Sequence, residues 1–364
     1  MRETKTYNRQ SIWTFWILTW MLFPAIAVIC GALSSCKSED VVIEYDKTFE
    51  ETQKLAIEKG KKAFCIVLSR PDCPPCVPYI EKLGRQYKYL CTKAIFNIVD
   101  VQLPEHQWYQ QWACTGMLPT TCIFSTKGEL LAIVPGTSGP SMQCIESVLS
   151  GKEAKCADYL YNKRYPVLGG DYQTLLTTLL SCKFDLDSGI DISPTIDDCV
   201  QQTHYPYPIY LKYLNEAAQG RYDQAAFWAQ RLLEFDDTYY YLLYGDLYAQ
   251  AKYIANPDYN PRDAAILTVE SEVHLDNCKI HQPKRFALTL TNTGKTPLHI
   301  RNIEVGCSCL RLFNSKQLVL NAGEEQALDF EFTADTKGEI HRAITFFSDA
   351  SNAITYVHIY GNVK

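Results

Sequence analysis

The chain has 364 residues, enough for two or three domains, and its 47% hydrophobic and 21% charged content is ordinary for globular proteins. A formal net charge of −6 argues against nucleic-acid binding, which requires concentrated Lys and Arg. The single Gly-Gly pair, Gly169-Gly170, lacks the frame of a phosphate loop, so a nucleotide site of that kind is excluded as well.

The N-terminus has the order of an export signal: basic residues, an apolar stretch over residues 12–33, and then Leu33-Ser34-Ser35-Cys36. The apolar stretch is long enough to span a bilayer, so a retained signal anchor is the alternative. Leu-Ser-Ser-Cys resembles the bacterial lipobox, which implies that Cys36 is lipidated and becomes the first residue. We therefore expect a lipid anchor in the outer membrane of a bacterial cell envelope, on the periplasmic side rather than the cell surface.

A strand and a helix flank two cysteines near the start of the exported part. The apolar run Phe64–Leu68 predicts a strand that is buried on both faces, and helical spacing begins after Pro75. Cys73 is thereby expected at a helix N-terminus, where the macrodipole favours the reactive thiolate and the side chain is exposed. A structural disulfide and half of a zinc site are the alternatives. The chain lacks the second ligand pair that a zinc ribbon needs, so we predict a redox pair, Cys73 and Cys76, and no metal.

Further along, Leu118-Pro119-Thr120 precedes an apolar run and a turn at Lys127-Gly128. With the C-x-x-C pair, this arrangement resembles the thioredoxin family over roughly residues 42–150. The resemblance implies a cis Pro119 beside the sulfurs, with Leu118 and Thr120 at the substrate-binding position. It also implies that Cys73 is the nucleophile and Cys76 the resolving thiol.

Three residues depart from the family pattern. Asp72 replaces the usual tryptophan, Pro78 is an extra break in the helix, and Val67 stands where a buried acid often accepts a proton. Pro74 and Pro75 supply no N–H group, and the negative charge of Asp72 disfavours a neighbouring thiolate. We therefore expect a reductase or isomerase rather than a strong oxidase.

The cysteine content is high, at fifteen. Cys30 leaves with the signal and Cys36 would be acylated, so thirteen remain and at least one stays unpaired. We expect free, buried thiols at positions in apolar or helical surroundings. These are Cys65, Cys91, Cys114, Cys122 and Cys144.

Residues 151–262 form a tyrosine-rich region with three segments of helical spacing, over 207–218, 221–235 and 238–254. The stretch that begins Gly220-Arg221-Tyr222 resembles the step between helices of a tetratricopeptide repeat. Barely one and a half units are present, and such arrays usually need about three to be stable. We favour a helical spacer that packs on a neighbour, and a docking surface is the alternative.

Beyond Asn260-Pro261 the apolar period changes to two, and turns separate about seven short runs. This predicts an all-β sandwich of immunoglobulin type. The stretches Thr291–Gly294 and Cys307-Ser308-Cys309 resemble a bacterial immunoglobulin-like family of unknown function, akin to the Hydin and major-sperm-protein sandwiches. If Cys307 and Cys309 lie on a strand, they point to one face. They could then bind a soft metal or bond to each other, but packing or a bond to another cysteine is favoured.

These observations predict a multidomain protein with an α/β thioredoxin-like fold, an α-helical tetratricopeptide-like spacer and an all-β immunoglobulin-like sandwich. The expected boundaries are a lipoprotein signal peptide over 1–36 and domains over 37–150, 151–262 and 263–364. The predicted function is a membrane-tethered thiol–disulfide oxidoreductase without cofactor. Its partners would be protein disulfide substrates and a membrane-bound electron donor. The alternative is a non-catalytic envelope scaffold.

Overall fold

The computed structural model describes residues 43–152, 172–235, 238–256, 258–260 and 262–364. The predicted signal sequence and lipidated Cys36 lie outside the described residues, as does the start of the helical region. Within the described ranges, no helix is both long and apolar enough to cross a bilayer.

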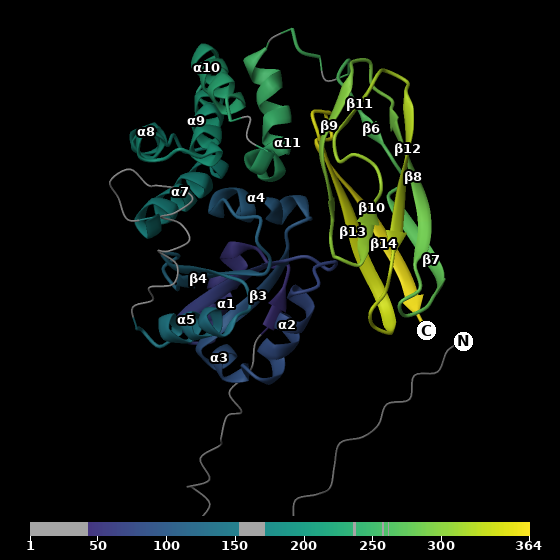
Figure 1. Ribbon diagram of the computed structural model, residues 1–364. Helices are drawn as coiled ribbons and strands as arrows, with labels where there is room; N and C mark the ends of the chain where they lie inside the picture. The colour runs from purple at the N-terminus through teal and green to yellow at the C-terminus, as the bar shows by residue number, and fades with distance from the viewer. Residues whose placement is uncertain (1–42, 153–171, 236–237, 257, 261) are drawn as a thin grey trace, which may run out of the picture. The chain divides into compact units, whose positions relative to one another are not determined.

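Residues 43–149 form a five-stranded mixed sheet with helices packed around it (Figure 1). The strand order is β1-β3-β2-β4-β5; β1, β3 and β2 are parallel to one another, β4 runs antiparallel to β2, and β5 runs antiparallel to β4. The elements are β1 (Ile43–Tyr45), α1 (Phe49–Glu58), β2 (Ala63–Ser69), α2 (Cys76–Arg85), α3 (Lys88–Lys93), β3 (Ala94–Asp100), α4 (Pro104–Ala113), β4 (Thr120–Ser125), β5 (Leu130–Pro135) and α5 (Gly139–Leu149).

The central strand β2 is buried along its whole length, as its unbroken apolar run predicts. Phe64 of β2 stacks on Phe124 of β4 with ring centroids 5.3 Å apart, and Phe49 of α1 packs edge-on against Phe64 at 5.1 Å. Helix α1 begins at a capping box, in which Thr48 Oγ1 accepts from the backbone N–H of Glu51 and the Glu51 carboxylate accepts from that of Thr48. Local sequence signals thus place this helix against the sheet.

The helical region packs on this sheet and shares its hydrophobic core. Trp112 Nε1 of α4 donates to the Leu176 carbonyl at 2.9 Å, and the Tyr244 hydroxyl donates to the Gln111 carbonyl at 2.6 Å. The backbone N–H of Leu130 donates to a hydroxyl of α7. The described helices of the helical region are α7 (Tyr172–Asp187), α8 (Ser193–Gln202), α9 (Pro206–Ala218), α10 (Tyr222–Leu233) and α11 (Thr238–Ala255).

Residues 262–364 form a β-sandwich with a separate core. One sheet has the order β10-β12-β8-β6 and the other β11-β9-β13-β14-β7, and every pairing is antiparallel except β14 with β7. The strands are β6 (Leu267–Thr268), β7 (Glu272–Cys278), β8 (Lys284–Asn292), β9 (Leu298–Val305), β10 (Leu310–Leu312), β11 (Leu318–Leu320), β12 (Glu325–Phe332), β13 (Gly338–Ser348) and β14 (Ile354–Val363).

Nine strands are present in residues 262–364, rather than the expected seven or so. The apolar period does not reveal β6, β10 and β11, because each has only two or three residues. Strands this short present too few alternations to register as a pattern.

The turn predicted from Thr291–Gly294 is organised by a buried amide. The Asn292 side chain is fully buried, and its Oδ1 accepts from the backbone N–H groups of Ile266 and Gly294 at 3.3 and 3.0 Å. Its Nδ2 donates to the carbonyls of Thr296 and Leu320 at 2.8 and 3.0 Å. One side chain therefore satisfies buried backbone groups from three separate segments of the sandwich.

We expect Asn292→Ala to destabilise the sandwich by about 2–4 kcal/mol, because buried backbone groups lose their partners. The exposed Asn321, which donates to Glu324 at 2.9 Å, provides the control. Asn321→Ala should cost less than about 1 kcal/mol. Hydrogen–deuterium exchange of the full chain, measured on peptides of β8 and β11, compares the two variants. Equal protection in both would contradict an anchoring role for Asn292.

Candidate functional site

The cysteine pair lies at the end of the central strand. Cys73 and Cys76 form a disulfide with their Cα atoms 5.3 Å apart, in the segment that joins β2 to α2. The Cys73 carbonyl accepts from the backbone N–H groups of Cys76 and Val77 at 3.0 and 3.4 Å. The turn therefore closes on Cys73, and Cys76 is the first residue of α2.

The structure corrects two expectations about Cys73. Helix α2 begins at Cys76 rather than Cys73, and Pro78 supplies a physical reason: it has no N–H group to donate to the Pro74 carbonyl, so the first turn is irregular. Cys73 is also not exposed, because only 3% of its surface is accessible, against 0% for Cys76. Both sulfurs are therefore shielded from large reagents in this conformation.

The Leu118–Pro119 peptide bond is cis and lies beside the same end of β2. Strand β4 begins at Thr120, which pairs with Leu68 near the end of β2, so the preceding Leu118 and Pro119 lie next to the segment that leads to Cys73. Leu118 is half-buried and Pro119 is buried. The fold thus brings together the C-x-x-C pair and the Leu118-Pro119-Thr120 motif, although Cys73 and Pro119 are 46 positions apart in the sequence.

Two hydroxyl groups fix the strand β4 at this point. Tyr79 of α2 forms a buried hydrogen bond of 2.8 Å with Thr121 and ties the cysteine-bearing helix to β4. Thr120 is fully buried, and its hydroxyl donates to the Met117 carbonyl at 2.7 Å. The Thr120 side chain thus stabilises its own loop, and sequence patterns gave no indication of the contact between Tyr79 and Thr121.

Asp72, directly before Cys73, is a fully buried acid. Its Oδ1 lies 3.4 Å from Nε of Arg70, and among the described residues neither carboxylate oxygen accepts a hydrogen bond. Removing a carboxylate from water costs several kcal/mol unless a charge offsets the loss. The partly exposed Arg70 is the cation that makes this burial possible.

A second acid, Asp100, ends the neighbouring strand β3 and pairs in register with Ser69 of β2. Burial raises the pKa of Asp100, and the charges of Asp46 and Asp72 act in the same direction. Parallel strands therefore bring two carboxyl groups to the edge of the sheet where the cysteine pair lies.

Residues of the sandwich lie against Asp72. A Cβ atom built on Gly306 would be 3.3 Å from Oδ2 of Asp72, and the charges of His341 and Asp72 interact. Burial and the neighbouring His358 lower the pKa of His341, and Asp72 partly offsets that shift. Burial also raises the pKa of Tyr356, which feels the charges of Arg70 and Asp72. The Asp72 carboxylate thus lies close to the turn after β9 and within electrostatic range of side chains on β13 and β14.

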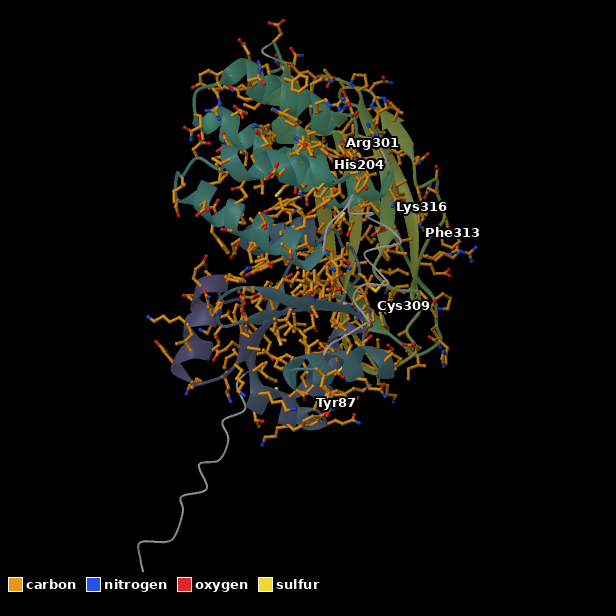
Figure 2. All side chains as sticks on the ribbon, turned by 90° about the vertical axis from the view of Figure 1, so that its left-hand side faces the viewer. Tyr87, His204, Arg301, Cys309, Phe313 and Lys316 are labelled. Atoms are coloured by element: carbon orange, nitrogen blue, oxygen red, sulfur yellow. A yellow bond between two sulfur atoms is a disulfide. The ribbon has the colours of Figure 1, made fainter. Side chains whose placement is uncertain are left out.

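Cys307 and Cys309 are disulfide-bonded to each other, with Cα atoms 5.1 Å apart. The favoured expectation of packing, or of a bond to another cysteine, was wrong. The two residues also lie in the turn between β9 and β10 rather than on a strand, and Figure 2 labels Cys309. The turn removes the extended geometry that would direct both side chains to one face, and both residues are half-buried.

The remaining described cysteines are all buried, as was expected for five of them. They are Cys65, Cys91, Cys114, Cys122, Cys144, Cys182, Cys199 and Cys278. No cluster of His, Cys, Asp and Glu in the described ranges is arranged to bind a metal ion. His106 is packed in the interior, with Nε2 3.7 Å from Asp46.

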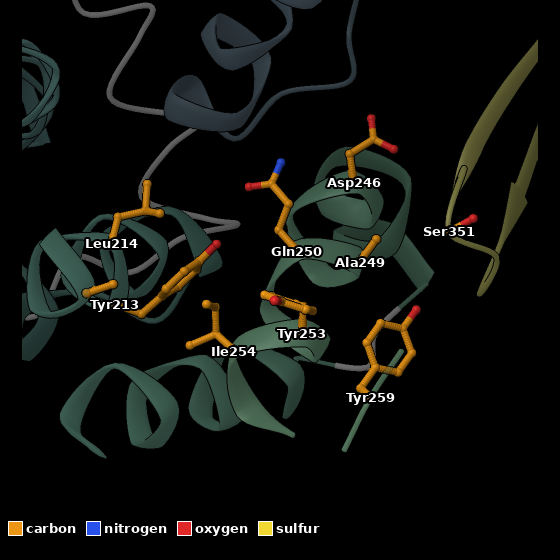
Figure 3. A pocket seen from close by; sticks show the side chains of 10 residues that line it. Tyr213, Leu214, Asp246, Ala249, Gln250, Tyr253, Ile254, Tyr259 and Ser351 are labelled. Atoms are coloured by element: carbon orange, nitrogen blue, oxygen red, sulfur yellow. The ribbon is translucent and has the colours of Figure 1, made fainter. Parts of the chain in front are cut away.

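A cavity of about 600 Å³ opens between α9 and α11, away from the cysteine pair in the sequence (Figure 3). Tyr213, Tyr253 and Tyr259 line it, together with Asp246. Burial raises the pKa of Asp246, whose carboxylate accepts from Gln107 at 2.8 Å. The lining combines these tyrosines with aliphatic side chains, and its other polar members are Gln250 and Ser351.

Burial predicts the order in which reduced cysteines react. In the reduced, folded chain, iodoacetamide should label Cys307 and Cys309 at least about fivefold faster than Cys73 and Cys76, because access limits thiol reactions. Mass spectrometry of quenched samples measures each rate, and the same reaction in urea gives the unfolded reference. Labelling of folded Cys73 at its rate in urea would contradict the burial of this site.

Comparisons with known proteins concern mainly the C-terminal part. The family profile described as "Protein of unknown function (DUF1573)" matches residues 266–363. No curated protein is significantly similar to the chain in sequence.

Several solved structures resemble parts of the chain. A protein of unknown function from Porphyromonas gingivalis W83 has 12% identity and a TM-score of 0.26, and the match covers 29% of this chain and 50% of that chain. The ASH/PapD-like domain of human CEP192 has 10% identity and a TM-score of 0.25 over 29% of this chain and 89% of its own. Malassezia sympodialis thioredoxin has 18% identity and a TM-score of 0.25 over 32% of this chain and 94% of its own.

The first of these matches spans only half the length of the Porphyromonas protein. The two sheets of residues 262–364 and the matching family profile together identify the C-terminal module as an immunoglobulin-like β-sandwich.

Proposed function

We propose that this protein is an exported thiol–disulfide oxidoreductase whose N-terminal module has a thioredoxin-like fold. The observation that carries the proposal is the Cys73–Cys76 disulfide, which joins the central strand to a helix beside a cis proline at Pro119. A cysteine pair in such a position can cycle between dithiol and disulfide without moving the rest of the sheet.

In the proposed reaction, the Cys73 thiolate attacks a disulfide of a client protein and forms a mixed disulfide. Cys76 then attacks Cys73, and the second client sulfur leaves as a thiol. The client gains two electrons and two protons, and the Cys73–Cys76 disulfide is restored. Leu118 and Pro119 lie where an extended client segment would pass, and a membrane-bound dithiol donor would reduce the pair again.

The charges at the site favour reducing or isomerising activity. Asp72 is buried next to Cys73, and a buried negative charge disfavours the thiolate that a strong oxidase stabilises. Arg70 is already engaged at 3.4 Å from the Asp72 carboxylate, which limits its effect on the sulfur. We expect a reduction potential nearer to the roughly −270 mV of thioredoxin than to the roughly −120 mV of a strong oxidase.

One observation favours a second candidate function. Both sulfurs are almost completely buried, as in a structural disulfide, and the protein would then be a non-catalytic envelope scaffold. The tyrosine-lined cavity between α9 and α11 would be a binding site in that case. Turnover separates the two candidates.

Catalysis can be tested with the full exported chain, a protein disulfide as substrate and a dithiol reductant. We expect Cys73→Ser to abolish turnover, because the nucleophile is lost. Cys278→Ala removes a buried free thiol of the sandwich and is the matched control, with turnover retained. Absence of turnover in the unmodified chain would support the scaffold, and equilibration with glutathione at a potential above about −150 mV would refute a reducing role.

The membrane anchor is tested separately, since Cys36 lies outside the described residues. We expect a labelled fatty acid to be incorporated into the chain in cells, and Cys36→Ala to lose the label. Cys30→Ala is the matched control, because Cys30 would be removed with the signal peptide. Label on the Cys36→Ala variant, or a mature protein that retains residues 12–33, would instead indicate an uncleaved anchor.

A further inference from the structure

The two disulfides found among the described residues lie in segments that come close together. Asp72 directly precedes Cys73, and Gly306 directly precedes Cys307. A Cβ atom on Gly306 would lie 3.3 Å from the Asp72 carboxylate and 3.1 Å from the carbonyl of Ala343. The residues that adjoin the two cysteine pairs are thus close neighbours in space, although 234 positions separate Asp72 from Gly306 in the sequence.

Contacts within the sandwich and between the sandwich and α11 fix the position of the turn that contains Cys307. The backbone N–H of Gly306 donates to the Ala343 carbonyl of β13 at 2.9 Å, which fixes the turn on the sandwich. The sandwich is itself held on α11, where the Arg301 guanidinium lies over the ring of Tyr241 at 4.3 Å. Lys252 of α11 also donates to the carbonyl of Asp349 at 3.3 Å.

The two pairs differ in their access to solvent. Cys73 and Cys76 are 3% and 0% exposed, whereas Cys307 and Cys309 are half-buried and flank the exposed Ser308. Thiol–disulfide exchange requires a direct approach of the attacking sulfur, so an external dithiol reaches Cys307–Cys309 more easily. A bond between cysteines only two positions apart also closes too small a loop to stabilise the fold much by chain entropy.

We infer that Cys307 and Cys309 are a second redox pair, which exchanges electrons with Cys73 and Cys76 inside the same chain. This inference rests on the proposed oxidoreductase function. It gives the sandwich a chemical role, because the more accessible Cys307–Cys309 pair would connect the buried Cys73–Cys76 pair to external dithiols.

The exchange balances without any further reactant once an external protein dithiol has reduced Cys307 and Cys309. The Cys307 thiolate attacks the sulfur of Cys73, the Cys73–Cys76 bond breaks, and Cys76 leaves and takes up a proton. Cys309 then attacks Cys307, and Cys73 leaves and takes up a proton. Two electrons and two protons have moved, so that Cys307–Cys309 is again a disulfide and Cys73 and Cys76 are thiols.

The first experiment follows reduction of the full exported chain by limiting thioredoxin-type dithiol protein, with rapid alkylation and mass spectrometry. We expect thiols to appear first at Cys307 and Cys309 and then at Cys73 and Cys76. In Cys307→Ser/Cys309→Ser, reduction of Cys73–Cys76 should be about tenfold slower or more, because only the buried pair remains. The eight other cysteines of the described residues, all of them buried, stay in every variant as internal references.

The second experiment traps the intermediate and does not depend on rates. The variant Cys76→Ser/Cys309→Ser retains the attacking thiol, Cys307, and its target, Cys73. These two cysteines should form an intramolecular disulfide on mild oxidation with glutathione disulfide. Its yield should not depend on protein concentration, because the partners belong to one chain. Cys73→Ser/Cys309→Ser, which leaves Cys76 and Cys307, is the matched control and should form less of this bond.

Equal reduction rates with and without Cys307 and Cys309, together with no intramolecular bond in the trapping variant, would overturn the relay. The proposed function would survive that result if Cys73 and Cys76 still turned over a client disulfide. If the unmodified chain is never reduced at Cys73–Cys76 and shows no turnover, the proposed function itself fails. The two failures are therefore distinguishable in the same samples.

Discussion

The rest of this structure depends on a strand that must be covered on both faces. All seven residues of β2 are buried, so the sheet cannot stand with one side in water. Helices that lie far along the chain provide part of the cover, since Trp112 and Leu130 of the α/β module bond to α7 and Tyr244 of α11 bonds to α4. This shared core explains how the helical region is stabilised: its apolar side chains complete the core of the neighbouring α/β module.

Local patterns in the sequence predicted the elements well, because periodicity and capping act over a few residues. The strand before Cys73, the capping box at Thr48 and the β-period of the sandwich are features of this kind. The burial of Cys73 and Asp72, the partner of Cys307 and the bonds of Asn292 were not predictable. Each depends on a segment more than twenty residues away or on a turn whose geometry no period reveals.

The ion pair of Arg70 and Asp72 limits which substitutions the site can tolerate. A carboxylate without hydrogen bonds depends on the nearby Arg70 cation, so loss of Arg70 alone would leave Asp72 as an unpaired buried charge. Such a pair is weak evidence for stability. It does fix the electrostatic field at the first cysteine, and the contact with Gly306 extends that field to the sandwich. In this way one acid acts on both the chemistry of the pair and the packing of the modules.

The buried thiols are protected from oxidation only after the chain has folded. Burial raises the pKa of Cys91 to about 11 and the pKa values of Cys65 and Cys122 still further, so the folded protein contains almost no thiolate at these positions. An unfolded chain in an oxidising compartment has no such protection and can form many wrong disulfides. If the chain is exported as proposed, its folding therefore competes with oxidation, and the rate at which its core closes decides how many molecules reach the native state.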